Sequence, residues 1–286
     1  MITDFEKNKV YLAKGLSSPC YGEVYSYLVK ELQRYHVAYS ELPRTESPLH
    51  IWVRDYMPIQ TGKHSFVQFR YDPDYLKDEP EYKPDVEAIL AGLNIQVTQS
   101  DIVLDGGNVI SCGEKAIVTD KIFKENPHYG KTDLIDRLSD LLEAELVIVP
   151  WDKYEEFGHA DGMVRYLGGN KVLLNNYGDF DSSLRRKLVS ALSPHFEITE
   201  LHYGPHSDLS WAYLNFLHVG KFVFVPLLHE TLAQTAFKQI EEALPGSIYI
   251  PIHHGEYLAK HGGALNCATW TTSEDVSIKS FTAKEA

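Results

Sequence analysis

The chain has 286 residues, of which 44% are apolar and 23% are charged, a composition that excludes disordered, collagenous and fibrous proteins. Its 27 Lys and Arg against 40 Asp and Glu residues give a net charge of −13, which argues against nucleic acids and anionic membranes as partners. Cationic small molecules are the favoured ligands. Because no linker rich in Pro, Gly or Ser divides the chain, we expect one domain over residues 1–286.

The cysteines and the N-terminus indicate a cellular compartment. Cys20, Cys112 and Cys267 form no C-x-x-C pair and are odd in number, so we expect free thiols. No basic and apolar leader begins the sequence, and no apolar run approaches 18 residues. These features predict a soluble cytoplasmic protein. Spacings typical of metal ligands are also missing, so we expect neither a metal nor another cofactor.

A pattern of strand, turn, strand, helix and strand recurs along the chain. The N-terminal part carries only its second half, with a strand at 10–12, a helix at 22–35 and a strand at 37–39. Four full units follow, at 62–97, 107–149, 162–201 and 213–250. Their amphipathic helices are predicted at 85–93, 132–143, 181–192 and 231–244. Their opening strands are predicted at 107–110, 162–167 and 213–219, and their last strands at 95–97, 146–149, 196–201 and 248–250.

The two chain ends complete a fifth unit. Residues 264–270 have the pattern of a hairpin opening, which the strand and helix at the N-terminus would continue. A ring closed in this way leaves no sheet edge exposed, as in propellers. We therefore predict an α/β protein with five pseudo-symmetric blades of ββαβ units, closed by its own termini.

One polar or reactive residue stands at the head of each unit. These residues follow one another at intervals of 50, 56, 54 and 52 positions: Asp55, Asp105, Asp161, Asn215 and Cys267. In a ring they would lie at the same end and line one pocket. His159 is two residues from Asp161, so in an extended segment both side chains would point to one face.

A cysteine, a histidine and several carboxylates suit reactions of a guanidinium group. Carboxylates can hold this planar, permanently charged fork of N–H donors by bidentate hydrogen bonds. Its central carbon is deactivated by resonance, so attack requires a strong nucleophile such as a thiolate. An imidazole can then protonate the departing ammonia and later take a proton from water.

Four stretches resemble the agmatine deiminase and bacterial peptidylarginine deiminase family of guanidine-modifying enzymes. They are Trp52-Val53-Arg54-Asp55, Asp105-Gly106-Gly107-Asn108, Gly158-His159-Ala160-Asp161 and Gly262-Gly263-Ala264-Leu265-Asn266-Cys267, with Tyr213-Leu214-Asn215-Phe216 as a weaker fifth. The resemblance implies the five-bladed α/β-propeller called the pentein fold, with no metal. The sequence departs from the family at Asn266, where His is typical, and at Met57, where Gly is usual.

The resemblance also implies the roles of individual residues. Cys267 would be the nucleophile, His159 the acid and base, and Asp55 and Asp161 the clamps on the guanidinium. The residues expected to bind substrate are Trp52, Glu155, Asp105 and Asn215. Each has an alternative role: core packing for Trp52, an exposed loop for Glu155, a structural place for Asn215, and for Asp105 the cap of a turn that contains two glycines.

These observations predict a cysteine-dependent hydrolase that converts a guanidino compound to a ureido product and ammonia. Agmatine, free arginine, peptidyl arginine and other guanidines remain possible substrates. An amidinotransferase would use the same covalent intermediate and pass the amidino group to an amine. A non-catalytic guanidine-binding protein would bind without turnover, and a metal hydrolase is a further alternative.

Overall fold

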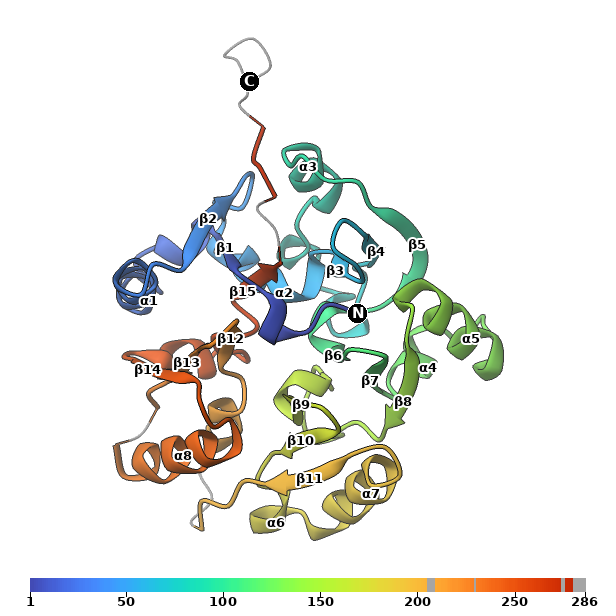
Figure 1. Ribbon diagram of the computed structural model, residues 1–286. Helices are drawn as coiled ribbons and strands as arrows, with labels where there is room; N and C mark the ends of the chain where they lie inside the picture. Colours follow the sequence, from blue (N-terminus) through green and yellow to red (C-terminus); the bar gives the residue numbers. More distant parts are fainter. Residues whose placement is uncertain (205–208, 229, 274–275, 280–286) are drawn as a thin grey trace.

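Five three-stranded sheets are arranged around a central axis as the blades of a ring (Figure 1). The computed structural model describes residues 1–204, 209–228, 230–273 and 276–279. Four blades are formed by consecutive segments: β3 Ile59–Gln60, β4 Phe66–Arg70 and β5 Thr98–Val103; β6 Val109–Cys112, β7 Lys115–Thr119 and β8 Glu145–Val149; β9 Val164–Gly168, β10 Lys171–Leu174 and β11 Glu197–Glu200; β12 Leu217–Val219, β13 Phe222–Pro226 and β14 Ile248–Ile252.

All four of these blades have the same topology. The middle strand pairs antiparallel with the strand before it and parallel with the strand after it. A parallel neighbour requires a crossover connection, and here a helix makes it. The crossover helices are α3 Val86–Ala91, α5 Lys131–Leu142, α7 Ser182–Leu192 and α8 Glu230–Ala243. This confirms the predicted ββαβ unit.

The two chain ends build the fifth blade. Its outer strands β15 (Thr269–Thr272) and β2 (Ala38–Leu42) flank β1 (Lys9–Ala13), with α1 (Gly22–Arg34) as the crossover. Strand β1 pairs antiparallel with β15 and parallel with β2. The ring is therefore closed by hydrogen bonds between the two ends of the chain, as predicted.

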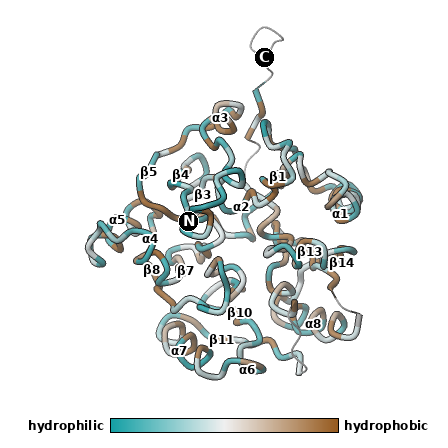
Figure 2. The backbone as a smooth tube through the Cα atoms, turned by 180° about the vertical axis from the view of Figure 1, so that it is seen from behind, coloured by the Kyte–Doolittle hydropathy of each residue, from teal (hydrophilic) through white to brown (hydrophobic). Residues whose placement is uncertain are grey.

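Three of the crossover helices, α1, α5 and α7, bury leucines or valines four residues apart. In α5 these are Leu134, Leu138 and Leu142, and α1 and α7 repeat the spacing with Val24, Leu28 and Leu32 and with Leu184, Leu188 and Leu192. Residues at this spacing share one helix face, which packs on the blade. Each such side chain contributes about 1.5–3 kcal/mol when fully buried. Figure 2 shows hydrophobic and hydrophilic residues interspersed along helices such as α7 and α8.

The predicted strand at 95–97 is wrong, because β5 begins only at Thr98. The predicted strand at 213–219 is too long, because β12 begins only at Leu217. The predicted opening strands at 107–110 and 162–167 likewise begin later, at Val109 and Val164. Before three of these opening strands, the chain makes a 3-10 turn that apolar periodicity cannot distinguish from a buried strand.

The remaining elements are short. The α-helical turns are α2 Val53–Tyr56, α4 Ile122–Glu125, α6 Tyr177–Phe180 and α9 Gly255–Ala259. The 3-10 turns are η1 Asp4–Glu6, η2 Lys14–Ser17, η3 Pro48–His50, η4 Asp74–Leu76, η5 Pro80–Tyr82, η6 Gly106–Asn108, η7 Ala160–Gly162 and η8 Ser210–Tyr213.

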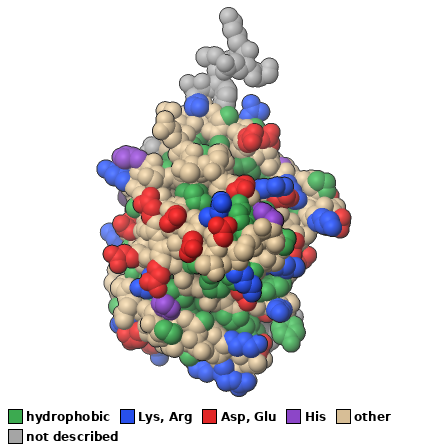
Figure 3. Space-filling view, turned by 90° about the vertical axis from the view of Figure 1, so that its right-hand side faces the viewer, with side chains coloured by type: hydrophobic (Ala, Val, Ile, Leu, Met, Phe, Trp, Pro, Cys, Tyr) green, Lys and Arg blue, Asp and Glu red, His purple; other side chains and the backbone are tan. Residues whose placement is uncertain are grey.

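Across the described ranges, no helix has the length and apolar character needed to span a bilayer. In the side view of Figure 3, acidic side chains are spread over the middle of the surface, with Lys and Arg among and below them.

Candidate active site

The five head residues come together at one end of the ring. Asp55 lies in α2, Asp105 directly precedes η6, Asp161 lies in η7, Asn215 follows η8, and Cys267 precedes β15. Hydrogen bonds join the heads of different blades, because Gly107 N donates to Asp55 Oδ1 at 3.1 Å and Cys267 N donates to Asn215 Oδ1 at 3.2 Å. The predicted convergence is thus a property of the fold.

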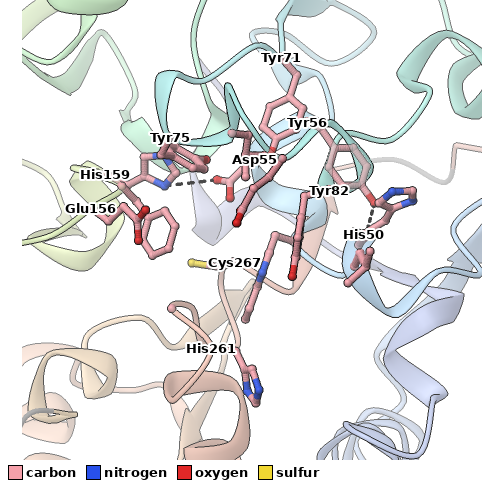
Figure 4. A pocket seen from close by; sticks show the side chains of 16 residues that line it. His50, Asp55, Tyr56, Tyr71, Tyr75, Tyr82, Glu156, His159, His261 and Cys267 are labelled. Atoms are coloured by element: carbon pink, nitrogen blue, oxygen red, sulfur yellow. Dashed lines mark hydrogen bonds and ion pairs between the residues drawn. The ribbon is translucent and has the colours of Figure 1, made fainter.

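A cavity of about 190 Å³ opens at this end of the ring (Figure 4). Four of the predicted residues line it: Trp52, Asp55, His159 and Cys267. In Figure 4 the sulfur of Cys267 points toward the side on which His159 lies. The imidazole, the thiol and one carboxylate therefore face a common space large enough for a small molecule.

His159 is held between two carboxylates. Its Nε2 lies 2.8 Å from Asp105 Oδ2, and its Nδ1 lies 3.5 Å from Asp55 Oδ1. Burial by itself lowers the pKa of His159, but Asp55 and Asp105 outweigh this effect and raise the pKa to about 10. The imidazole is therefore protonated at neutral pH, and it can act as an acid.

Asp105 does not cap the turn that follows it. Asp105 is the N-cap residue of η6, but its side chain accepts no hydrogen bond from the backbone of that turn. Its Oδ2 instead accepts hydrogen bonds from Tyr75 at 2.9 Å and from the His159 ring. The glycines after Asp105 serve close packing, because a Cβ on Gly107 would collide with Asp55 and His159. Asp105 does not line the cavity, and it contacts the cavity only through the imidazole of His159, which it orients.

Cys267 is buried and is fixed by its backbone. Asn215 Oδ1 accepts hydrogen bonds from the N–H groups of Ala264 and Cys267, both at 3.2 Å, and Arg54 N donates to Cys267 O at 3.1 Å. Asn215 is fully buried and does not line the cavity. Its contacts therefore place it as a support of the cysteine loop.

The carboxylate of Asp161 lies beside the thiol. Cys267 Sγ is 3.4 Å from Asp161 Oδ2, and the Asn266 side-chain amide donates to the same oxygen at 2.7 Å. Burial raises the pKa of the Cys267 thiol well above its ordinary value, and Asp161 and Asp55 raise it further. The thiol is therefore protonated at neutral pH. His159 is extended and Asp161 lies in η7, so the two do not share the extended segment that we predicted.

The carboxylate of Asp55 also has an altered pKa. Burial raises its pKa to about 7, and Asp105 and Asp161 add to this effect while His159 opposes it. Asp55, Asp105 and Asp161 thus place three acidic side chains beside one imidazole and one thiol. Carboxylate oxygens in such an arrangement can accept hydrogen bonds from the N–H groups of a planar cation.

Trp52 and Phe157 line the cavity, and each packs closely against a glycine of the segment before Cys267. A Cβ on Gly263 would collide with the Trp52 ring, and a Cβ on Gly262 would collide with Phe157. Gly262 also has φ of +90°, a backbone conformation that side chains disfavour. The glycine pair in the motif before Cys267 is therefore required by packing against the walls of the cavity.

Glu155 is half-buried and does not line the cavity, whereas the adjacent Glu156 does. Burial raises the pKa of Glu155 to about 7, with His159 opposing and Asp161 adding to the shift. Sequence reasoning also missed Tyr75 and Tyr82, which the segment between β4 and α3 brings into the cavity. Neither tyrosine stands at a repeat position, so no spacing in the sequence identifies them.

The architecture defines the class of protein. A substrate-bound agmatine deiminase from C. jejuni superposes with a TM-score of 0.76 at 15% identity, covering 96% of both chains. An amidinotransferase of saxitoxin biosynthesis from Microseira wollei superposes with a TM-score of 0.66 at 14% identity, covering 99% of both chains. The five-bladed α/β ring is thus the pentein fold, and at these identities the likeness establishes the fold alone.

The sequence itself identifies the family. The chain belongs to the Porphyromonas-type peptidyl-arginine deiminase family, whose model matches residues 2–272. A protein from Vibrio parahaemolyticus named "Putative agmatine deiminase" is 25% identical, over 81% of this chain and 78% of its own length. The family resemblance inferred from the four motifs is confirmed.

Proposed function

We propose that the protein is a cysteine-dependent guanidine deiminase, which hydrolyses a guanidino compound to its ureido product and ammonia. Family membership supports this reaction class. The observation that carries the proposal is the placement of the Cys267 thiol 3.4 Å from Asp161 Oδ2, in a cavity that it shares with His159 and Asp55. The named agmatine deiminase relative agrees with it.

Substrate binding starts from the two carboxylates. In this proposal Asp55 and Asp161 accept hydrogen bonds from the guanidinium N–H groups, and the ring of Trp52 packs against the substrate. The bound cation compensates the charges that raise the pKa of Cys267. Binding thereby favours loss of the thiol proton to solvent, so that the thiolate nucleophile forms only when substrate is present.

The first half-reaction forms a covalent intermediate. The thiolate of Cys267 attacks the guanidinium carbon, and the new S–C bond gives a neutral tetrahedral adduct. Protonated His159 donates its proton to one amino group, the C–N bond breaks, and ammonia leaves. The C–N bonding pair leaves with ammonia, and a lone pair on a remaining substrate nitrogen forms the C=N bond of a thiouronium cation attached to the sulfur. His159 is now neutral.

The second half-reaction releases the product. Neutral His159 takes a proton from water, and the resulting hydroxide attacks the thiouronium carbon. The S–C bond then breaks and its electron pair returns to sulfur. The hydroxyl proton passes to solvent, where it converts the released ammonia to ammonium, and the ureido product leaves the regenerated thiolate. Asp105 holds the imidazole for both transfers through its contact with Nε2. No further reactant is consumed.

The mouth of the cavity favours a substrate with a cationic or neutral tail. Glu79 and Glu156 line it, and among the described residues that line the cavity there is no Lys or Arg. Arg70, at the end of β4, pairs with Asp72 at 2.5 Å and lies outside the lining, so it is not placed to bind a substrate carboxylate. We therefore infer that agmatine, or an arginine derivative without a free carboxylate, binds better than free arginine.

An ammonia-release assay over a panel of guanidines tests the proposal. The native protein is expected to release ammonia and a ureido product, and Cys267→Ser is expected to abolish release while the fold remains intact. Undiminished turnover in this variant would refute the assignment. An amidinotransferase would instead require an added amine acceptor, and a binding protein would show saturable binding without turnover.

A further inference from the structure

A second cavity lies behind the loops that carry Asp55 and Cys267. Their sequence neighbours Arg54 and Asn266 line it, whereas Asp55 and Cys267 line the front cavity. The N-terminal segment, which contributes further lining, crosses the middle of the ring in Figure 1. We call this cavity the rear chamber; the residues that matter here are Asp4, Lys7, Arg54, Ser111, Arg165 and Thr271.

The amino group of Lys7 is buried and has no charged partner among the described residues. The residue is 7% exposed, and its Nζ donates to the neutral Gln60 Oε1 at 3.2 Å. Within the described part of the chain, no carboxylate lies within ion-pair distance of this ammonium. Burial lowers the pKa of Lys7 to about 7, opposed by the more distant Asp4 and reinforced by Arg54.

Arg54 also meets only neutral acceptors. Its Nε donates to Asn266 O at 3.4 Å and its Nη2 donates to Thr271 Oγ1 at 3.3 Å. Both contacts are long for a charged donor, which usually bonds at about 2.7–2.9 Å. No ion pair joins Arg54 to a carboxylate in the described ranges, so much of its donor capacity is unused.

Arg165 pairs with Asp4, the one acidic residue that lines the rear chamber. Its Nη2 lies 2.8 Å from Asp4 Oδ2, and its guanidinium lies 4.7 Å from the Phe216 ring centre. Asp4 thus directly neutralises one of the three cations. The buried hydroxyl of Ser111, which also lines the chamber, has no hydrogen-bond partner among the described residues.

Buried basic groups without acidic partners are costly, and the rear chamber has three basic side chains, Lys7, Arg54 and Arg165, for the one carboxylate of Asp4. Arginine forks and a lysine ammonium are the groups that bind oxyanions in proteins. The chamber has a volume of about 50 Å³, more than the roughly 10–15 Å³ that one water requires. We propose that the rear chamber binds a small divalent oxyanion of the phosphate or sulfate type through Lys7, Arg54 and Arg165.

Thermal unfolding at constant ionic strength tests this proposal. Replacing chloride by phosphate or sulfate is expected to raise the Tm of the native protein, because a ligand that binds only the folded state stabilises it. Lys7→Met retains the stem and removes the ammonium, and should weaken the apparent affinity for phosphate at least tenfold. The control Lys238→Met alters an exposed lysine and should leave the affinity unchanged.

A Tm that does not change when phosphate or sulfate replaces chloride would overturn the proposal, as would an unchanged affinity in Lys7→Met. If Lys7→Met does not fold, crystals of the native protein soaked in selenate decide the question. An anomalous peak between the side chains of Lys7, Arg54 and Arg165 is the expected result. Its absence at that position would overturn the proposal independently of catalysis.

Discussion

The Sγ of Cys267 lies 3.4 Å from Oδ2 of Asp161, and burial together with this neighbouring carboxylate raises the pKa of the thiol. The same carboxylate is proposed to hold the substrate. Binding of a guanidinium and activation of the thiol are then one electrostatic event, because the cation removes the charge that opposes the thiolate.

Removing the charge of Asp161 should activate the thiol and impair catalysis. Asp161→Asn is expected to lower the pKa of Cys267, because Asp161 contributes to raising it, and so to speed alkylation by iodoacetamide at pH 8. The value of kcat/KM should fall by about 10²-fold or more, because a buried partner of the cationic substrate is lost. Asp133→Asn, on the exposed side of α5, is the control. Slower alkylation in Asp161→Asn would contradict this electrostatic account.

Substrate affinity should depend on pH through Asp55. Its pKa is raised to about 7, so the carboxylate gains a proton as the pH falls through 7. A guanidinium stays charged in this range and prefers the ionised carboxylate, so affinity should decrease below pH 7 by up to about tenfold per pH unit. Calorimetric titration of the Cys267→Ser variant with agmatine between pH 5.5 and 8 measures this effect. An affinity that is constant over this range would show that Asp55 does not hold the guanidinium.

Asp105 should act through the imidazole. Asp105→Asn removes a carboxylate that raises the pKa of His159, so the imidazole should titrate at lower pH in NMR spectra. We expect kcat to fall by about 10²-fold with little change in KM, because Asp105 positions the acid without lining the cavity. A variant whose His159 titration is unchanged would show that the 2.8 Å contact has no electrostatic role.

The space beside Trp52 should control substrate binding. Gly263→Ala places a methyl group against the indole ring and should displace it, so we expect KM to rise about tenfold or more. Gly130→Ala is the matched control, because a Cβ at that position meets no atom within 4 Å. Equal KM values for the two variants would argue that Trp52 does not contact substrate.

Repetition made most of the fold predictable. The helices at 132–143 and 181–192 match α5 and α7 to within a residue at either end, because their leucines recur every four positions. The strands failed where buried turns carry apolar residues: Tyr213, Leu214 and Phe216 read as a strand, but Tyr213 ends η8 and the strand begins only at Leu217. Hydrogen bonds to other blades fix these turns, and they leave no periodic signal.

By itself, the sequence determined the number of blades, the closure of the ring by its two ends and the set of head residues, because each depends on a pattern repeated along the chain. Tertiary structure alone decided which heads face the cavity and which support it. Asp105 turned out to hold His159, Asn215 to hold the Cys267 loop, and Glu156 to line the cavity in place of Glu155. The physical reason is that spacing places a residue at one end of the ring, whereas the direction of its side chain depends on contacts with other blades.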